Sequence, residues 1–252
     1  MDYYIQLLKK GCFTREEVAG ITGNLRTADS LLYSYKKKNY IESVRRNLYV
    51  ALSPETGGPV CNPYEIASKI FNDAYISHHS AFEFYGMANQ VFSEITVCSH
   101  SRFLPFEYDG KTYLYSGTGI NMGIESVGKV RVSDLERTIV DNIKDFTRYG
   151  GLEELLHCLS MVTYVDEKKL LVYMEAYNNQ FLHQKAGYIL SLFPDMKISP
   201  IFFEQCKKRI HKSVRYLYED LRTEKSSFIR EWKLYVPENI KDLLREGGES
   251  LV

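Results

Sequence analysis

Apolar positions recur at helical spacing through the first forty residues and predict three helices. The first covers residues 2–9. The second opens at a capping box, in which Thr14 caps the helix and Glu17 stands three residues later, and it is expected to last about two turns. Asn24 caps a third helix over residues 25–38, and its expected buried stripe is Leu25, Ala28, Leu31, Leu32 and Tyr35.

Two short apolar runs follow these helices and predict a β-hairpin. Residues 40–44 and 48–51 are expected to form its strands, and Arg45, Arg46 and Asn47 lie between them as the turn. A helix-turn-helix followed by a two-stranded hairpin within about fifty residues is typical of the winged helix-turn-helix. The sequence therefore predicts an α+β protein that begins with such a domain at residues 1–52.

The face of the third helix opposite its apolar stripe carries small polar and basic side chains. In DNA-binding domains of this type the helix after the turn enters the major groove, and the hairpin tip lies at the backbone or minor groove. The expected DNA-binding residues are therefore Arg26, Thr27, Ser30, Ser34 and Lys37 on the helix, and Arg45 and Arg46 at the tip. Protein docking stays an alternative, because a basic face is often only solvated.

The remainder of the chain is expected to form a second domain. Residues 53–62 are rich in Pro and Gly and predict a linker. The strands expected at 94–99, 103–108, 113–115 and 127–132, with a tight turn at Asp109 and Gly110, predict a small antiparallel sheet within residues 63–132. Residues 133–246 carry helical patterns, and 247–252 are expected to form a frayed tail.

The helix expected after residue 133 begins with a second capping box, Ser133 with Glu136. Arg137 and Asp141 are spaced four residues apart on this helix, and we expect them to pair on its exposed face.

Composition and charge place the chain among ordinary globular proteins. Of its 252 residues 44% are hydrophobic and 25% charged, which excludes collagen, coiled-coil and disordered classes. Five scattered cysteines without a CxxC pair favour reduced thiols in the cytoplasm, and no membrane segment is expected. Residues 1–51 carry nine Lys or Arg against five Asp or Glu, an excess that favours a polyanionic partner for this end of the chain.

The sequence offers few candidates for a metal site or a catalytic site. Adjacent His78 and His79 raise the question of a metal site, but neighbours on a helix point about 100° apart, and only Glu83 stands at a useful offset. A helix start capped by Ser77 accounts for both histidines. We therefore expect no metal, no cofactor and no catalytic residue. A nucleic-acid-processing enzyme remains a minor alternative, which cleavage dependent on Mg²⁺ would support.

The stretch 197–245 combines twelve Lys or Arg with aromatic residues, among them Trp232. Lys207, Lys208 and Arg209, followed by Lys212 and Arg215, predict two turns of basic helix face. This composition suits a nucleic acid, but the aromatic spacing also suits docking against the rest of the chain, and both interpretations stay open.

The order of motifs resembles the AbiEi family of antitoxins and transcriptional regulators. The similarity rests on ISHHSAFEFYGM (76–87), ITVCS (95–99), KVRVSDLERTIVDNI (129–143), YGGLEELLHCL (149–159), the stretch 165–193 and SFIREWKLYVPENI (227–240). The resemblance implies an N-terminal winged helix and a larger C-terminal antitoxin domain. It also implies repression of the chain's own promoter, through double-stranded DNA with inverted repeats, and a nucleotidyltransferase-like toxin as functional partner, with no direct contact required. The alternative is a plain winged-helix regulator whose C-terminal domain docks a partner or ligand.

Overall fold

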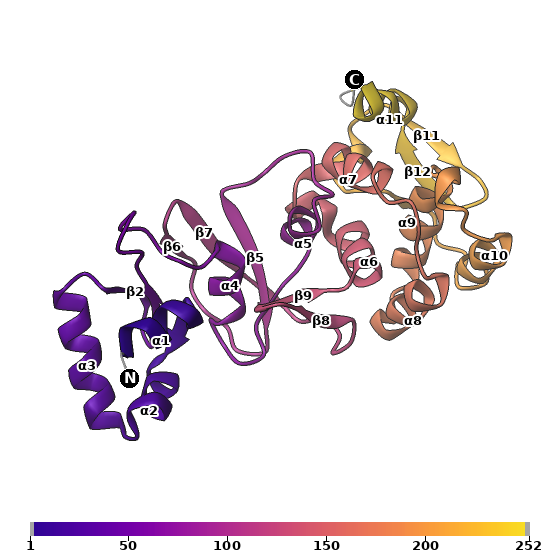
Figure 1. The fold of residues 1–252 in the computed structure, drawn as a ribbon. Coiled ribbons are helices and arrows are strands. Elements are labelled where there is room, and N and C mark those ends of the chain that lie inside the picture. The colour runs from indigo at the N-terminus through magenta and orange to yellow at the C-terminus, as the bar shows by residue number, and fades with distance from the viewer. Residues whose placement is uncertain (1–2, 250–252) are drawn as a thin grey trace. The chain divides into compact units, whose positions relative to one another are not determined.

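The computed structural model describes residues 3–249 and shows an α+β protein (Figure 1). The chain divides into two compact units, between which it passes repeatedly. Unit 1 consists of Met1–Ile76, Ser93–Gly117 and Ser126–Val132, and unit 2 of Ser77–Phe92, Thr118–Glu125 and Ser133–Val252. The first 52 residues and the expected linker at 53–62 thus belong to the same unit as most of the larger sheet.

Unit 1 begins with three helices, of which the second and third start where the local caps predict. They are α1 (Tyr3–Lys10), α2 (Arg15–Thr22) and α3 (Leu25–Lys37). The capping box of Thr14 and Glu17 is confirmed, and Asn24 caps α3 by accepting the backbone N–H of Thr27. Leu25 was expected in the core, but it is 47% exposed, because the first residue of α3 lies away from the buried cluster. That cluster consists of Leu7, Phe13, Val18, Ala28, Leu32, Ile41 and Ala51.

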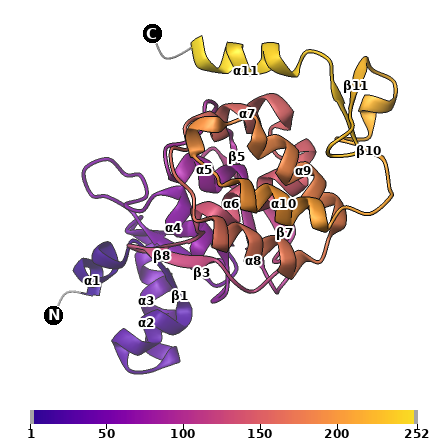
Figure 2. The same cartoon turned by 90° about the vertical axis from the view of Figure 1, so that its right-hand side faces the viewer.

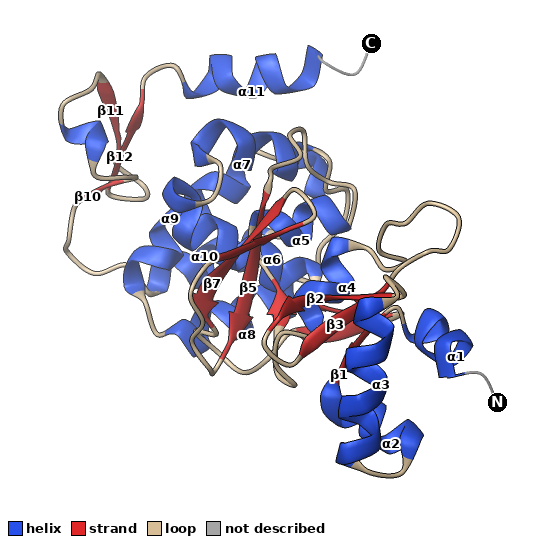
Figure 3. Cartoon of the chain, turned by 90° about the vertical axis from the view of Figure 1, so that its left-hand side faces the viewer, coloured by secondary structure: helices blue, strands red, loops and turns tan. Residues whose placement is uncertain are grey.

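A three-stranded antiparallel sheet completes the first part of unit 1. Its order is β1 (Cys12–Thr14), β3 (Leu48–Ala51) and β2 (Ile41–Arg45), and the predicted hairpin joins β2 to β3. Asn47 adopts a left-handed conformation in the turn, with φ of 67°. Asparagine tolerates this region better than most residues, so the turn can be tight. Figure 3 shows these strands beside α2 and α3.

The larger sheet has six strands, in the order β6-β7-β5-β4-β9-β8. The strands are β4 (Tyr75–Ile76), β5 (Glu94–Ser99), β6 (Phe106–Tyr108), β7 (Lys111–Gly117), β8 (Ile124–Val127) and β9 (Val130–Ser133). The predicted turn at Asp109 and Gly110 joins β6 to β7, and both residues have positive φ. The expected antiparallel sheet is nevertheless wrong, because β5 pairs parallel to β7 and β4 parallel to β9. The return through β6 leaves β7 running in the same direction as β5. Helix α4 (Pro63–Ser68), capped by Asn62, precedes β4.

Unit 2 is mainly helical and is built around α6 (Leu135–Asp145). Its other helices are α5 (His79–Phe84), α7 (Gly151–Ser160), α8 (Glu167–Tyr177), α9 (Gln180–Ser191), α10 (Pro200–Lys208) and α11 (Ile240–Glu249), with short 3-10 turns at Phe146–Arg148, Pro194–Met196 and Asp220–Arg222. Residues 136–143 of α6 are all buried. The expected tail falls partly in α11, and residues 250–252 lie outside the described part of the chain.

Two expectations for α6 are wrong because the helix is enclosed. Asp134, not Ser133, caps it, and the Glu136 carboxylate accepts the backbone N–H of Asp166 instead of closing a capping box. Arg137 and Asp141 do pair, with 2.7 Å between Nε and Oδ1, but both side chains are 1% exposed. The remaining guanidinium N–H groups donate to carbonyls of Thr118, Ile120 and Met122 and to the Tyr177 hydroxyl, so the pair is a buried clamp.

The end of unit 2 docks Trp232 into the chain's own core. Strands β10 (Arg215–Tyr216), β12 (Leu234–Pro237) and β11 (Ser226–Ile229) form a small sheet (Figure 2). Trp232 is 3% exposed and packs so closely on Gly187 of α9 that a Cβ there would lie 2.1 Å from the indole. The predicted two-turn basic face is not formed, because α10 ends at Lys208. No helix within residues 3–249 is both long and apolar enough to span a bilayer.

Candidate nucleic-acid interface

The exposed face of α3 presents four side chains in one row. Arg26, Ser30, Tyr33 and Lys37 are separated by four, three and four residues, so helical geometry places them on the same face, and all four are exposed. Thr27 is also exposed, and Ser34 is half-buried at the flank of this row. The structure thus brings all five predicted residues of α3 to the solvent side of the helix.

Tyr33 is the member of this row that sequence reasoning missed. Its side chain is 73% exposed at the centre of the face, between Ser30 and Lys37. The spacing alone could have identified it, since it lies three residues after Ser30 and seven after Arg26. A tyrosine at this place offers a hydroxyl and an apolar ring to whatever binds α3.

Ser30 has a defined hydrogen-bonding state. Its hydroxyl donates to the Arg26 carbonyl at 3.1 Å, within its own helix. The oxygen lone pairs remain available as acceptors, because one hydroxyl proton is used and two acceptor sites are not. Ser30 is therefore suited to accept a hydrogen bond from an exocyclic amino group of adenine or cytosine in a major groove.

An ion pair fixes α3 against α2. The Arg15 guanidinium binds the Asp29 carboxylate through two contacts of 2.6 Å each. This pairing lowers the pKa of Asp29 and keeps its charge balanced next to the row of exposed residues. The one acidic side chain of α3 is thus neutralised within the protein, which leaves the face positive.

The hairpin tip is held to the start of α2. Asn47 accepts the backbone N–H of Arg15 at 3.2 Å and donates to Glu16 at 2.8 Å. Arg46 is exposed beside Asn47. These bonds present Arg46 in a fixed place relative to the two helices of the turn.

Arg45 lies elsewhere than the sequence led us to expect. A β-bulge between Ser43 and Arg45 shifts the register of β2, and the Arg45 guanidinium is half-buried over three rings of unit 1. Its central carbon lies 5.4, 5.4 and 5.3 Å from the ring centroids of Phe71, Phe103 and Phe106. The expected DNA contact of Arg45 is therefore replaced by an aromatic one in this structure.

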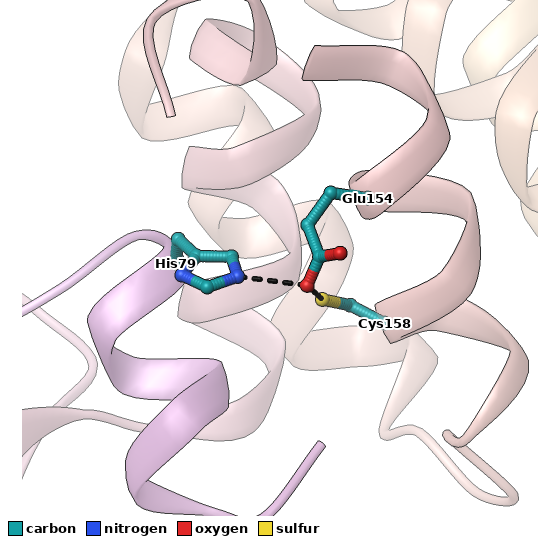
Figure 4. Close-up of side chains that lie close together, drawn as sticks. All are labelled: His79, Glu154 and Cys158. Carbon is teal, nitrogen blue, oxygen red and sulfur yellow. Dashed lines mark hydrogen bonds and ion pairs between the residues drawn. The ribbon is translucent and has the colours of Figure 1, made fainter. Parts of the chain in front are cut away.

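A second cluster of side chains, of types that can bind a metal ion or carry a proton, is buried in unit 2 (Figure 4). Nε2 of His79 on α5 lies 2.8 Å from Oε1 of Glu154 on α7, and Nδ1 lies 3.0 Å from Oε1 of Glu83. The Cys158 thiol lies 3.5 Å from the same Glu154 oxygen, which also accepts the backbone N–H of Asn89. His79 is not capped by Ser77 as expected, since His78 holds the N-cap position with φ of 54° and makes no side-chain cap bond.

The donor atoms of His79, Glu154 and Cys158 lie within 4.8 Å of one another and are of types that zinc accepts. A metal would require a neutral imidazole and a thiolate. Burial alone would lower the pKa of His79, but the carboxylates of Glu83 and Glu154 outweigh it and raise that pKa. Burial, helped by the Glu154 charge, also raises the pKa of the Cys158 thiol. Both shifts oppose metal binding, and they favour instead a protonated clamp between α5 and α7. The sequence indicated only Glu83 as a partner of His79, because Glu154 and Cys158 lie 75 and 79 residues further along the chain.

Comparison with known proteins finds no matching family model and no match among curated proteins. Among solved structures the chain is similar to the Rv2827c protein from Mycobacterium tuberculosis, with a TM-score of 0.62 and 15% sequence identity. The similarity covers 94% of this chain and 89% of that one. At this identity the likeness concerns the fold alone, and it extends over the α+β arrangement of nearly the whole chain.

Proposed function

We propose that residues 3–51 form a winged helix-turn-helix domain that binds double-stranded DNA. The observation that carries the proposal is the row of Arg26, Ser30, Tyr33 and Lys37 on the helix that follows the turn. In this arrangement α3 enters the major groove, and Arg46 at the hairpin tip meets the phosphate backbone or the minor groove.

The dimensions of the row suit this assignment. Arg26 and Lys37 are separated by eleven residues, or about 16 Å along the helix axis. They can therefore contact phosphates toward the two sides of a groove about 12 Å wide, while Ser30 and Tyr33 face the base edges between them. Phosphate contacts supply affinity and salt dependence, and the two central side chains supply discrimination between sequences.

The wider role that we propose is that of an AbiEi-type antitoxin and autorepressor. Its support is the order of motifs from residue 76 to residue 240, read together with a DNA-binding N-terminal domain. The chain would bind inverted repeats in its own promoter in the cytoplasm and counter a nucleotidyltransferase-like toxin. The proposal assigns no catalytic step to the chain and requires no stable complex with the toxin.

Fluorescence anisotropy on the chain's own upstream duplex, against a scrambled duplex and across a salt series, tests the DNA-binding half. We expect Arg26→Ala, Lys37→Ala and Arg46→Ala each to weaken binding to both duplexes and to reduce the salt slope by about one. Arg230→Ala removes the same charge from an exposed position of unit 2 and serves as the control.

Ser30→Ala and Tyr33→Ala should instead reduce the preference for the upstream duplex, with little change in salt slope. Equal binding of all variants would refute the interface. The antitoxin half is tested separately, by co-expression with the product of the adjacent gene. Rescue of growth by the intact chain supports the antitoxin role. If the product of the adjacent gene is not toxic, the alternative of a plain winged-helix regulator is favoured.

A further inference from the structure

A cavity of about 600 Å³ opens in unit 2 between α9, the turn after α6 and residues 213–222. Its chemically distinctive lining residues are Lys185, Arg215, Arg222, Phe181, Tyr216 and Glu219. The volume lies within the range of small-molecule sites, roughly 300–1,000 Å³. Most of its lining, residues 213–222, belongs to the stretch whose basic and aromatic composition stands out in the sequence, and the proposed DNA interface does not use the cavity.

Lys185 is a buried cation that has no counterion in the part of the chain that the structure describes. Its side chain is on α9 and only 7% of the residue is exposed. The ammonium donates to the Lys144 carbonyl at 3.1 Å and lies 4.7 and 4.8 Å from the ring centroids of Phe146 and Phe181. No carboxylate of the described residues lies within ion-pair distance of it. Asp145, which acts on Lys185 at longer range, is already paired with Lys144 and His78.

Burial of such a cation is costly and disfavours its charged form. Loss of solvation lowers the pKa of Lys185 to about 8, although the Asp145 charge acts in the opposite direction. An ammonium has three donors, and among residues 3–249 only one of them has an acceptor. The side chain lines the cavity, so an anion entering there would find both a charge and unused donors.

Two arginines add to this charge at more exposed positions of the lining. Arg215 lies over the Phe181 ring at 5.3 Å and Arg222 over the Tyr216 ring at 5.9 Å. Neither guanidinium forms an ion pair with the described residues. Because ring faces rather than carboxylates hold them, their N–H groups stay available to a ligand. Glu219 is the one carboxylate among the residues that line the cavity, so three cations face a single acid.

We propose that this cavity binds a small phosphorylated ligand of nucleotide size. A phosphate group meets the requirement for a multiply charged anion, and arginine and lysine together are its usual protein partners. Lys185 would contact the phosphate at the buried end, and Arg215 and Arg222 would contact it nearer the opening. The cavity is larger than an inorganic phosphate needs, so the phosphate is expected to be part of a larger molecule. The inference goes beyond the proposed DNA binding and does not depend on it.

Isothermal titration and thermal unfolding of the full chain test the site, with ATP and GTP as probes. Pyrophosphate and adenosine separate the contribution of phosphate from that of the base. We expect saturable binding of the nucleotides, a ligand-dependent rise in the midpoint of unfolding, and no binding of adenosine. Lys185→Met and Arg222→Gln should each weaken nucleotide binding about tenfold or more, since each removes a charge-assisted hydrogen bond. Arg230→Gln, an exposed arginine outside the lining, should bind as the natural chain does.

Lys185→Met is not expected to unfold the protein, because it replaces an unpaired buried cation by an apolar side chain of similar length. A raised midpoint without ligand, together with loss of the nucleotide-dependent shift, would support the proposal. The proposal is overturned if no nucleotide binds, or if the two lining variants bind as tightly as the control. If a single-stranded oligonucleotide binds more tightly than ATP and GTP, and the same variants weaken its binding, the ligand of the cavity is a nucleic-acid strand and the small-ligand proposal is wrong. If pyrophosphate binds as tightly as ATP and GTP, the nucleoside adds no affinity, and the proposal of a nucleotide-sized ligand is rejected.

Discussion

Replacing Arg45 by alanine tests whether its guanidinium is held by aromatic rings instead of being offered to DNA. In the structure the guanidinium lies within 5.4 Å of three phenylalanine centroids, and its Nη1 is buried without a hydrogen-bond partner among the described residues. Arg46, the next residue, is exposed. Two adjacent arginines that look equivalent in the sequence should therefore respond differently to the same substitution.

The expected loss can be worked from these contacts. A cation over a ring contributes about 0.5–1 kcal/mol at exposed sites and about 2 kcal/mol when desolvated. The three rings share one charge, so their contributions do not simply add. The unsatisfied Nη1 costs about 1 kcal/mol or more, which offsets part of this stabilisation. Loss of packing by the methylene stem acts in the same direction as loss of the cation. We expect Arg45→Ala to lower the free energy of unfolding by about 1–2 kcal/mol.

Thermal unfolding and DNA binding are both needed as readouts. For a chain of this size the loss corresponds to a fall in the unfolding midpoint of about 2–8 °C. Arg46→Ala should change the free energy of unfolding by no more than about 0.5 kcal/mol, but should reduce the salt slope of DNA binding by about one. Arg45→Ala should leave that slope unchanged. An unaltered midpoint for Arg45→Ala, combined with the reduced slope, would show that this side chain leaves the rings to contact phosphate.

Three further substitutions test the interior of unit 2. Arg137→Met should lower the free energy of unfolding by about 3–5 kcal/mol in urea titrations, because it leaves the Asp141 carboxylate buried and unpaired. Gly187→Ala should lower it by about 1–3 kcal/mol and shift the emission of Trp232, the single tryptophan, because a Cβ would lie 2.1 Å from its ring. For Lys185 the folded pKa of about 8 lies below the unfolded value of 10.5, so the unfolded chain binds more protons between these pH values. The natural chain should therefore gain up to about 3 kcal/mol relative to Lys185→Met as pH rises through that window, measured by unfolding at each pH.

Local signals account for what the sequence predicted well. A helix cap or a two-residue turn depends on side chains within four residues of one another. Thr14 with Glu17, Asn24 and the turn at Asp109 could therefore be identified without knowledge of the fold. The row on α3 is also local, because a helix of known register fixes which residues share a face.

Burial and long-range pairing account for what the sequence did not predict. The spacing of Arg137 and Asp141 indicates a pair but not its surroundings, and only the fold encloses it with the carbonyls of residues 118–122. Arg45 was misplaced because its rings lie on segments 26 and more residues away, and because the register of β2 shifts between Ser43 and Arg45. The partners of His79 on α7 could not be found by any local pattern.

The pH dependence of stability can decide whether the cluster around His79 is a protonated clamp or a metal site. Its two carboxylate neighbours raise the folded pKa of this histidine above the unfolded value of 6.5. The stabilisation is therefore fully present below pH 6.5 and is lost as pH rises through the folded pKa, since the folded chain binds the extra proton in that window. The difference in unfolding midpoint between the natural chain and His79→Gln should shrink as pH rises above 6.5. A bound zinc ion would give the opposite sign, because its ligands must lose protons to bind and because chelators would remove the effect. Stability that rose with pH and fell on addition of EDTA would replace the protonated clamp by a metal centre.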